Sequence, residues 1–104
     1  MFEIPEIDVT DFQRDKSKYI LVDVREPHEL AGPEGQIEGV ILAPMGSRFA
    51  HFISSADPEQ RYVFICRSGH RSAQACTMAH TYGFHKVYNL KGGMVAWNQL
   101  LTKF

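Results

Sequence analysis

Hydrophobic residues along the chain form short runs that alternate with segments of helical periodicity. Near-continuous apolar runs cover residues 19–24 and 62–66, which is typical of strands buried on both faces of a parallel sheet. Residues 72–82 contain strong helix formers with an apolar face. That face consists of Ala75, Met78, Ala79 and Tyr82. The alternation predicts an α/β fold, with a central, mostly parallel sheet and helices on both faces.

Weaker patterns predict further elements between these segments. Shorter strands are expected at residues 4–7, 40–42 and 86–90, and the run at 40–42 is expected to be buried. Asp8 can cap a helix through about residue 16, and Pro27 can open a short helical turn. Further helices are expected at residues 47–54 and from 92–93 onward.

Size and charge favour a single soluble domain, residues 1–104. A net charge of −1 gives no support for nucleic-acid or membrane partners, which usually require a basic surface. No apolar run approaches the roughly 20 residues of a membrane helix. The N-terminal residues also lack the pattern of a signal peptide. We therefore expect a cytoplasmic protein whose two cysteines are thiols, too few to build a metal site unaided.

The most informative segment joins Cys66, at the end of a buried strand, to the helix predicted from Ser72. Gly69 permits a tight bend, and the amides of residues 67–72 can then turn inward as an anion-binding nest. The helix start adds its dipole at the same point. Arg67 and Arg71 add positive charge near the sulfur, and His70 is a further ionisable side chain in the loop. We therefore expect the pKa of Cys66 to lie below the usual value of about 8.5.

Loop length separates two kinds of cysteine chemistry. Between Cys66 and Arg71 the loop has one residue fewer than the protein tyrosine phosphatase signature. A shorter loop suits the terminal sulfur of a persulfide better than a tetrahedral phosphate, so sulfur transfer is preferred. The alternatives are a small cysteine-dependent phosphatase or arsenate reductase, and a non-catalytic docking or redox-relay module. A buried cysteine can also be only a small hydrophobic residue.

Four segments, in order and spacing, resemble the signatures of the rhodanese family. They are residues 22–29, 35–44, 66–72 and 83–97. Gln36 and Glu38 depart from the family pattern, where histidine and proline are common, at positions that look structural. The resemblance spans most of the chain, with a signature-bearing core at about residues 15–103. It implies a single-domain, rhodanese-like α/β fold.

The resemblance also implies a sulfurtransferase of the thiosulfate sulfurtransferase type. Such an enzyme moves a sulfane sulfur from thiosulfate or another persulfide donor to cyanide, a thiol or a protein. Cys66 corresponds to the catalytic residue that carries the persulfide. The substrate-binding residues implied are Arg67, Ser68, Gly69, His70, Arg71 and Ser72. The expected partners are a small anionic sulfur donor and a thiol or protein acceptor, with no metal or organic cofactor.

Asp23 and Arg25 follow a buried strand and are expected near this loop. A hydrogen-bonded pair that fixes the neighbouring loops is favoured over direct contact with substrate. Either Asp23 or Glu26 is expected to hold Arg71 in place.

Two other segments have competing interpretations. Cys76 is expected to pack within its helix rather than to act as a resolving thiol for Cys66. The segment containing Phe49, His51 and Phe52 could line one wall of the active-site pocket. The sequence carries no signal for the physiological donor and acceptor, the oligomeric state or a partner enzyme.

Overall fold

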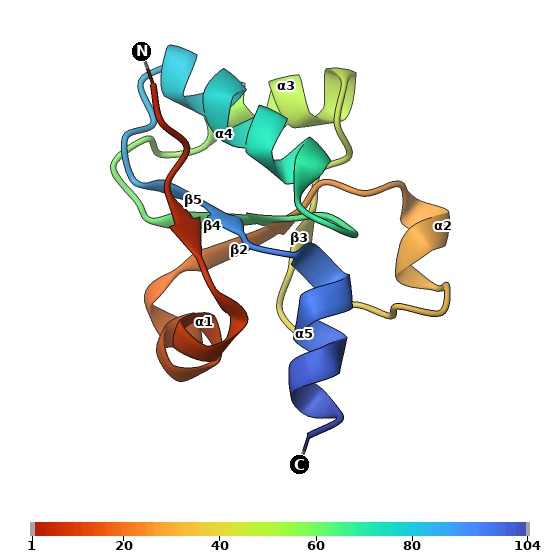
Figure 1. Ribbon diagram of the computed structural model, residues 1–104. Helices are drawn as coiled ribbons and strands as arrows, with labels where there is room; N and C mark the ends of the chain where they lie inside the picture. Colours follow the sequence, from red (N-terminus) through yellow and green to blue (C-terminus); the bar gives the residue numbers. More distant parts are fainter. Residues whose placement is uncertain (1, 104) are drawn as a thin grey trace.

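The computed structural model describes residues 2–103 and contains a parallel sheet between two layers of helices (Figure 1). The strands are β1 (Glu6–Ile7), β2 (Ile20–Asp23), β3 (Ile41–Leu42), β4 (Tyr62–Ile65) and β5 (Val87–Leu90). Their order across the sheet is β1-β5-β4-β2-β3, and every neighbouring pair is parallel. The α/β prediction is confirmed.

Helices cover both faces of this sheet. They are α1 (Val9–Asp15), α2 (Pro27–Leu30), α3 (Ser47–Ser55), α4 (His70–Thr81) and α5 (Gly93–Leu101), with a 3-10 turn at Lys16–Lys18. In Figure 1, α3 and α4 lie above the sheet, α1 and α5 lie below it, and α2 lies to one side. Asp8 caps α1 as expected, because its side chain accepts a hydrogen bond from the Asp11 amide at 2.9 Å. Within residues 2–103, no helix has the length and apolar character needed to cross a membrane.

The hydrophobic core is divided by the sheet because successive strand side chains point to opposite faces. One cluster joins the central strands to α3 and α4, and includes Val22, Phe64, Phe49, Ala75 and Ala79. The other joins them to α1 and α5, and includes Leu21, Val63, Phe12, Met94 and Trp97. Cys66 belongs to the first cluster, so its side chain lies on the α4 face of the sheet.

Three details of the predicted elements are wrong. The strand at β3 is an edge strand rather than a buried one, and Ile41 is 43% exposed. Tyr82 does not join the apolar face of α4, where Cys76 is buried instead; Tyr82 follows the end of the helix and is 65% exposed. The helix also begins at His70 rather than Ser72, because Gly69 has a φ of +106° and turns the chain directly into it.

Candidate active site

The sulfur of Cys66 lies inside the turn formed by residues 67–72. The Gly69 amide nitrogen is 3.1 Å from Sγ, and the Ser72 amide nitrogen is 3.4 Å from it. The Ser72 hydroxyl oxygen is 3.2 Å from the same sulfur. Since α4 begins at His70, these amides belong to the N-terminal end of a helix, where backbone N–H groups lack carbonyl partners and attract anions.

These contacts lower the pKa of the Cys66 thiol below its ordinary value of 9.0. Burial is the largest single influence and by itself raises the pKa. Hydrogen bonds from the Ser72 hydroxyl and from the amides of Ser72, Gly69 and Ser68 together outweigh it. The charge of Arg71 reaches the sulfur as a weaker interaction. Hydrogen bonds, rather than the arginine charges, therefore provide most of the stabilisation of the thiolate.

Cys66 lies at the bottom of the loop and is only 1% exposed. Its immediate polar neighbours are two backbone N–H groups and the Ser72 hydroxyl, so the sulfur is buried against groups that can donate hydrogen bonds. Around it, Arg67, Ser68 and His70 are exposed. Any reaction at the sulfur must therefore take place at the loop, within reach of its backbone amides.

Helix α5 packs against the start of the loop. The Met94 amide donates to the Cys66 carbonyl at 2.9 Å, and the Val95 amide donates to the Arg67 carbonyl at 3.0 Å. These bonds satisfy carbonyls at the start of the loop with N–H groups at the start of α5. The N-terminal ends of two helices thus support the same turn. The start of α4 supplies amides to the Cys66 sulfur, and the start of α5 supplies amides to the Cys66 and Arg67 carbonyls.

Both loop arginines engage carboxylates of the segment that follows β2. Arg71 makes two hydrogen bonds to Glu29, with Nη1–Oε1 at 2.7 Å and Nη2–Oε2 at 2.8 Å. The expectation that Asp23 or Glu26 holds Arg71 is therefore wrong. Arg67 is more exposed, and its Nε lies 3.6 Å from Glu34 Oε1. The guanidinium groups thus connect the loop to residues 29–34.

Asp23 and Arg25 form a fully buried ion pair beside this loop. Arg25 Nη2 is 2.8 Å from Asp23 Oδ2, and both side chains are 0% exposed. Arg25 also donates to the carbonyls of Gly35 and Glu29, at 2.8 and 3.3 Å. Asp23 is paired in register with Ile65, the residue before Cys66. The pair joins the end of β2 to the segment that supplies the carboxylates.

The fold and this loop agree with a comparison against known families, in which residues 8–100 match the profile named Rhodanese-like domain. The chain belongs to the rhodanese-like domain family. A Bacillus subtilis protein named as a candidate sulfurtransferase, YtwF, is 43% identical over 77 residues, which cover 74% of this chain and 71% of that protein. A sulfurtransferase of Allochromatium vinosum is 41% identical over 87 residues, covering 80% and 75%.

Solved structures agree with this assignment of the family. The crystal structure of a rhodanese-like domain protein from Staphylococcus aureus superposes with a TM-score of 0.80 at 27% identity. The match covers 90% of this chain and 91% of that one.

Sequence reasoning missed Asn89, a contact of the loop in this rhodanese-like domain. Its side chain is 2% exposed, accepts a hydrogen bond from the Ser72 hydroxyl and donates to the Gly69 carbonyl at 3.0 Å. The available signal was a polar residue within an otherwise apolar strand. Because Asn89 is two residues from Val87, the two side chains share the face of β5 that points toward α4.

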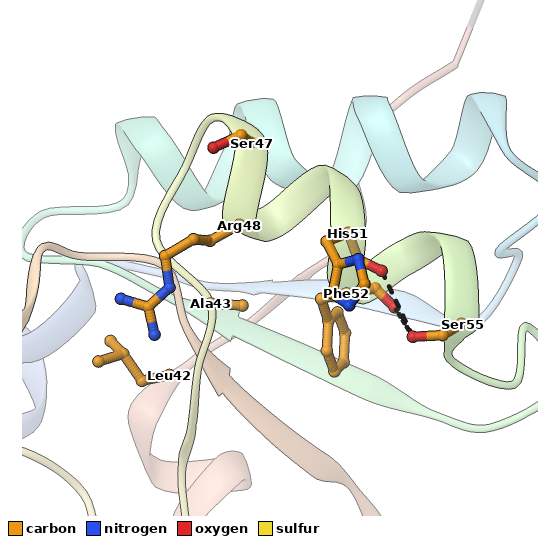
Figure 2. A pocket seen from close by; sticks show the side chains of 7 residues that line it. All are labelled: Leu42, Ala43, Ser47, Arg48, His51, Phe52 and Ser55. Carbon is orange, nitrogen blue, oxygen red and sulfur yellow. Dashed lines mark hydrogen bonds between the residues drawn. The ribbon is translucent and has the colours of Figure 1, made fainter.

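The segment around α3 does not form a wall of the Cys66 site in this rhodanese-like domain. Phe49 is buried in the core, whereas His51 and Phe52 line a separate pocket of about 490 Å³ beside β3 (Figure 2). The other lining residues are Leu42, Ala43, Ser47, Arg48 and Ser55. Figure 2 shows Arg48 extending toward Leu42 at one end of this pocket. None of the lining residues comes from residues 66–72, so the expected wall is wrong.

Cys76 is a buried residue of α4. Both Cys66 and Cys76 are free thiols, and the Cys76 side chain packs in the core with 0% exposure. Burial first, and then the charge of Glu6, raise the pKa of Cys76 to about 12. Cys76 therefore stays protonated under conditions in which Cys66 ionises, which agrees with a packing role.

Gly93, the first residue of α5, packs against the backbone of Cys66 and Arg67, and we expect Gly93→Ala to disturb both the helix and the loop. Gly93 has a φ of +58°, which costs an L-residue about 1–2 kcal/mol. A Cβ there would also lie 2.6 Å from the carbonyl carbon of Arg67. The free energy of unfolding should fall by more than about 2 kcal/mol, and the pKa of Cys66 should rise as the loop shifts. Urea unfolding and thiolate absorbance against pH measure the two effects.

Gly83→Ala is the matched control for this prediction. Gly83 also has a positive φ, of +93°, but a Cβ added there would meet nothing within 4 Å. It should therefore show the backbone strain without any change in the Cys66 titration. A Gly93→Ala protein with the wild-type titration would show that close packing of α5 does not shape the loop.

The Glu29–Arg71 pair predicts a pH-dependent contribution to stability. The hydrogen bonds from Arg71 lower the pKa of Glu29 from 4.5 to about 2, against the opposing effect of burial. Because the folded pKa is the lower one, the stabilisation is complete above pH 4.5 and is lost as pH falls toward about 2. For this partly exposed pair we expect Glu29→Gln to cost about 0.5–1 kcal/mol at neutral pH.

The cost should shrink steadily as the pH is lowered through that window, in urea unfolding curves recorded at a series of pH values. Glu38→Gln, at an exposed position, controls for a general loss of negative charge. A difference between wild type and Glu29→Gln that stays constant down to pH 2 would contradict the assigned ion pair.

Proposed function

We propose that the chain is a sulfurtransferase that carries sulfane sulfur as a persulfide on Cys66. The sulfur comes from thiosulfate or another persulfide donor and passes to cyanide, a thiol or a protein acceptor. The observation that carries this proposal is the convergence of the Gly69 and Ser72 amides on the Cys66 sulfur, at 3.1 and 3.4 Å. Membership of the rhodanese-like family and two relatives named as sulfurtransferases support it.

The proposed reaction has two displacement steps. In the first, the electron pair of the Cys66 thiolate forms a bond to the sulfane sulfur of thiosulfate. The S–S bond of thiosulfate breaks, and sulfite leaves with the electron pair. In the second, the acceptor's electron pair bonds to the outer sulfur of the Cys66 persulfide, and the thiolate is regenerated. One difficult transfer is thereby divided into two, as in other covalent catalysis.

The loop supplies electrostatic stabilisation in both steps. The amides that hold the thiolate are already fixed by α4 and α5, so they need little reorganisation when charge moves to the outer sulfur. Donor and acceptor approach from the outer side, where Arg67, Ser68 and His70 are exposed. Arg71, held by Glu29, shapes the loop and adds charge at longer range. We propose that the reaction takes place in the cytoplasm, where a reducing environment would keep the Cys66 thiol available.

The test is incubation with thiosulfate followed by intact mass measurement and peptide mapping. We expect a gain of one sulfur atom, located on the peptide that contains Cys66 and released by cyanide. Cys76→Ala is the matched control, and it should take up sulfur as the wild type does. Turnover of an aryl phosphate without sulfur uptake would replace the proposal with a phosphatase. If neither a sulfur adduct nor turnover is observed with thiosulfate or with a glutathione persulfide donor, the chain would instead be a docking or redox-relay module.

A further inference from the structure

Asn89 connects three parts of the molecule through one buried carboxamide. On β5 it is paired in register with Phe64, two residues before Cys66, and its side chain lies on the same face of the sheet. Its contacts are the Ser72 hydroxyl at the start of α4, the Gly69 carbonyl at 3.0 Å and Glu6 Oε2 at 3.2 Å. The group therefore reaches the Cys66 sulfur through one intervening residue, Ser72.

The orientation of this carboxamide follows from the chemistry of its neighbours. The Gly69 carbonyl and the Glu6 carboxylate can only accept hydrogen bonds, so the amide nitrogen of Asn89 must face them. The amide oxygen must then face Ser72. Since that oxygen has no proton to give, the Ser72 hydroxyl is the donor in their hydrogen bond.

A single hydroxyl proton cannot serve two acceptors fully. When Cys66 is a thiol, its S–H can donate to Ser72 Oγ while Ser72 donates to Asn89, and every group is satisfied. When Cys66 is a thiolate, the sulfur becomes a second acceptor for the same proton. Turning the Ser72 hydroxyl toward sulfur would leave the buried Asn89 oxygen without its donor, which is costly in the interior.

We propose that Asn89 is a positioning residue that competes with the Cys66 thiolate for the Ser72 hydroxyl proton and so limits how readily Cys66 ionises. The role rests on the proposed use of Cys66 as the nucleophile. In the persulfide, the negative charge lies on the outer sulfur, and Ser72 can keep its bond to Asn89. The network thus opposes the free thiolate more than the persulfide, which favours the sulfur-loaded state.

Several other ionisable groups lie on the elements around this network, and Glu6 loses a hydrogen bond when Asn89 is replaced by an apolar residue. They are Glu6 on β1, Asp23 on β2, Glu29 on α2, Arg67 in the loop, and His70, Arg71 and Cys76 on α4. Glu6 contacts the nitrogen end of the carboxamide, and Arg71 reaches the sulfur by charge alone. Neither Glu6 nor Arg71 therefore replaces Asn89 as the acceptor of the Ser72 hydroxyl proton.

The test is the thiolate absorbance of Cys66 against pH in a double-mutant cycle of Asn89→Leu and Ser72→Ala. With Ser72 present, Asn89→Leu frees the hydroxyl for the sulfur, and the midpoint should fall by about one unit, or about tenfold in acid dissociation. In the Ser72→Ala background the same change at position 89 should leave the midpoint unchanged. Asn89→Val, a β-branched alternative suited to a strand, serves if Asn89→Leu does not fold.

The cycle separates this role from a purely structural one. If Asn89 acted only by holding the Gly69 carbonyl, its replacement would shift the midpoint equally with and without Ser72, and that result would overturn the proposal. A midpoint that rises or stays fixed when Ser72 is present would also overturn it. The titration needs no substrate. If wild-type protein failed to take up sulfur, the proposed function would fail while this result stood.

Discussion

A Cys66→Ser protein is expected to take up no sulfur from thiosulfate and to lose at least about a thousandfold of its rate of thiocyanate formation with cyanide. A serine hydroxyl in the same place is not ionised at neutral pH and cannot form the S–S bond that the persulfide requires. The backbone amides of Gly69 and Ser72 keep an acceptor in the serine oxygen, so the loop should still close. Intact mass and a colorimetric thiocyanate assay measure the two losses.

Two comparisons decide whether such a loss is chemical rather than structural. The unfolding midpoint of Cys66→Ser should remain close to that of the wild type, since a small side chain replaces another of similar size. Cys76→Ala changes a cysteine that is buried in α4, and it should retain both sulfur uptake and turnover. Uptake that persists in Cys66→Ser but disappears in Cys76→Ala would move the chemistry to the second cysteine.

The layers of this fold could be predicted because they depend on local patterns. Buried runs of apolar residues identified β2 and β4, and helical periodicity identified α4, since these signals are present within each segment. The order of the strands is a property of the whole chain. The run at Ile41–Leu42 therefore looked buried, whereas its position at the sheet edge leaves Ile41 exposed.

The hydrogen-bond partners of individual side chains were less predictable, because they also depend on how distant parts of the chain are arranged. The bend at Gly69 and the position of Cys66 follow from neighbouring residues, and the structure places the amides of Gly69 and Ser72 at the sulfur. The choice of Glu29 over Glu26 for Arg71 depends on which side of a four-residue helix faces the loop. Asn89 reaches the loop only because β5 lies next to β4.

Replacement of Arg25 should cause the largest loss of stability among these variants. Arg25→Leu would leave the Asp23 carboxylate buried without its partner, and would also remove donors from the Gly35 and Glu29 carbonyls. Breaking a buried ion pair on one side typically costs about 3–5 kcal/mol. Since a domain of this size has a free energy of unfolding of about 5–15 kcal/mol, the urea midpoint should fall substantially.

Arg14→Leu provides the matched control, because Arg14 forms ion pairs with Asp11 and Asp15 but is 65% exposed. That variant should cost less than about 1 kcal/mol. The double variant Asp23→Leu/Arg25→Leu should recover part of the loss, because it removes the unpaired buried charge. Equal costs for Arg25→Leu and Arg14→Leu would show that burial does not determine the strength of the pair. The larger expected cost of Arg25→Leu also bears on the site. Arg25 donates a hydrogen bond to the Glu29 carbonyl, and the Glu29 carboxylate holds Arg71. Stability at the end of β2 and the shape of the cysteine loop therefore depend on the same guanidinium group.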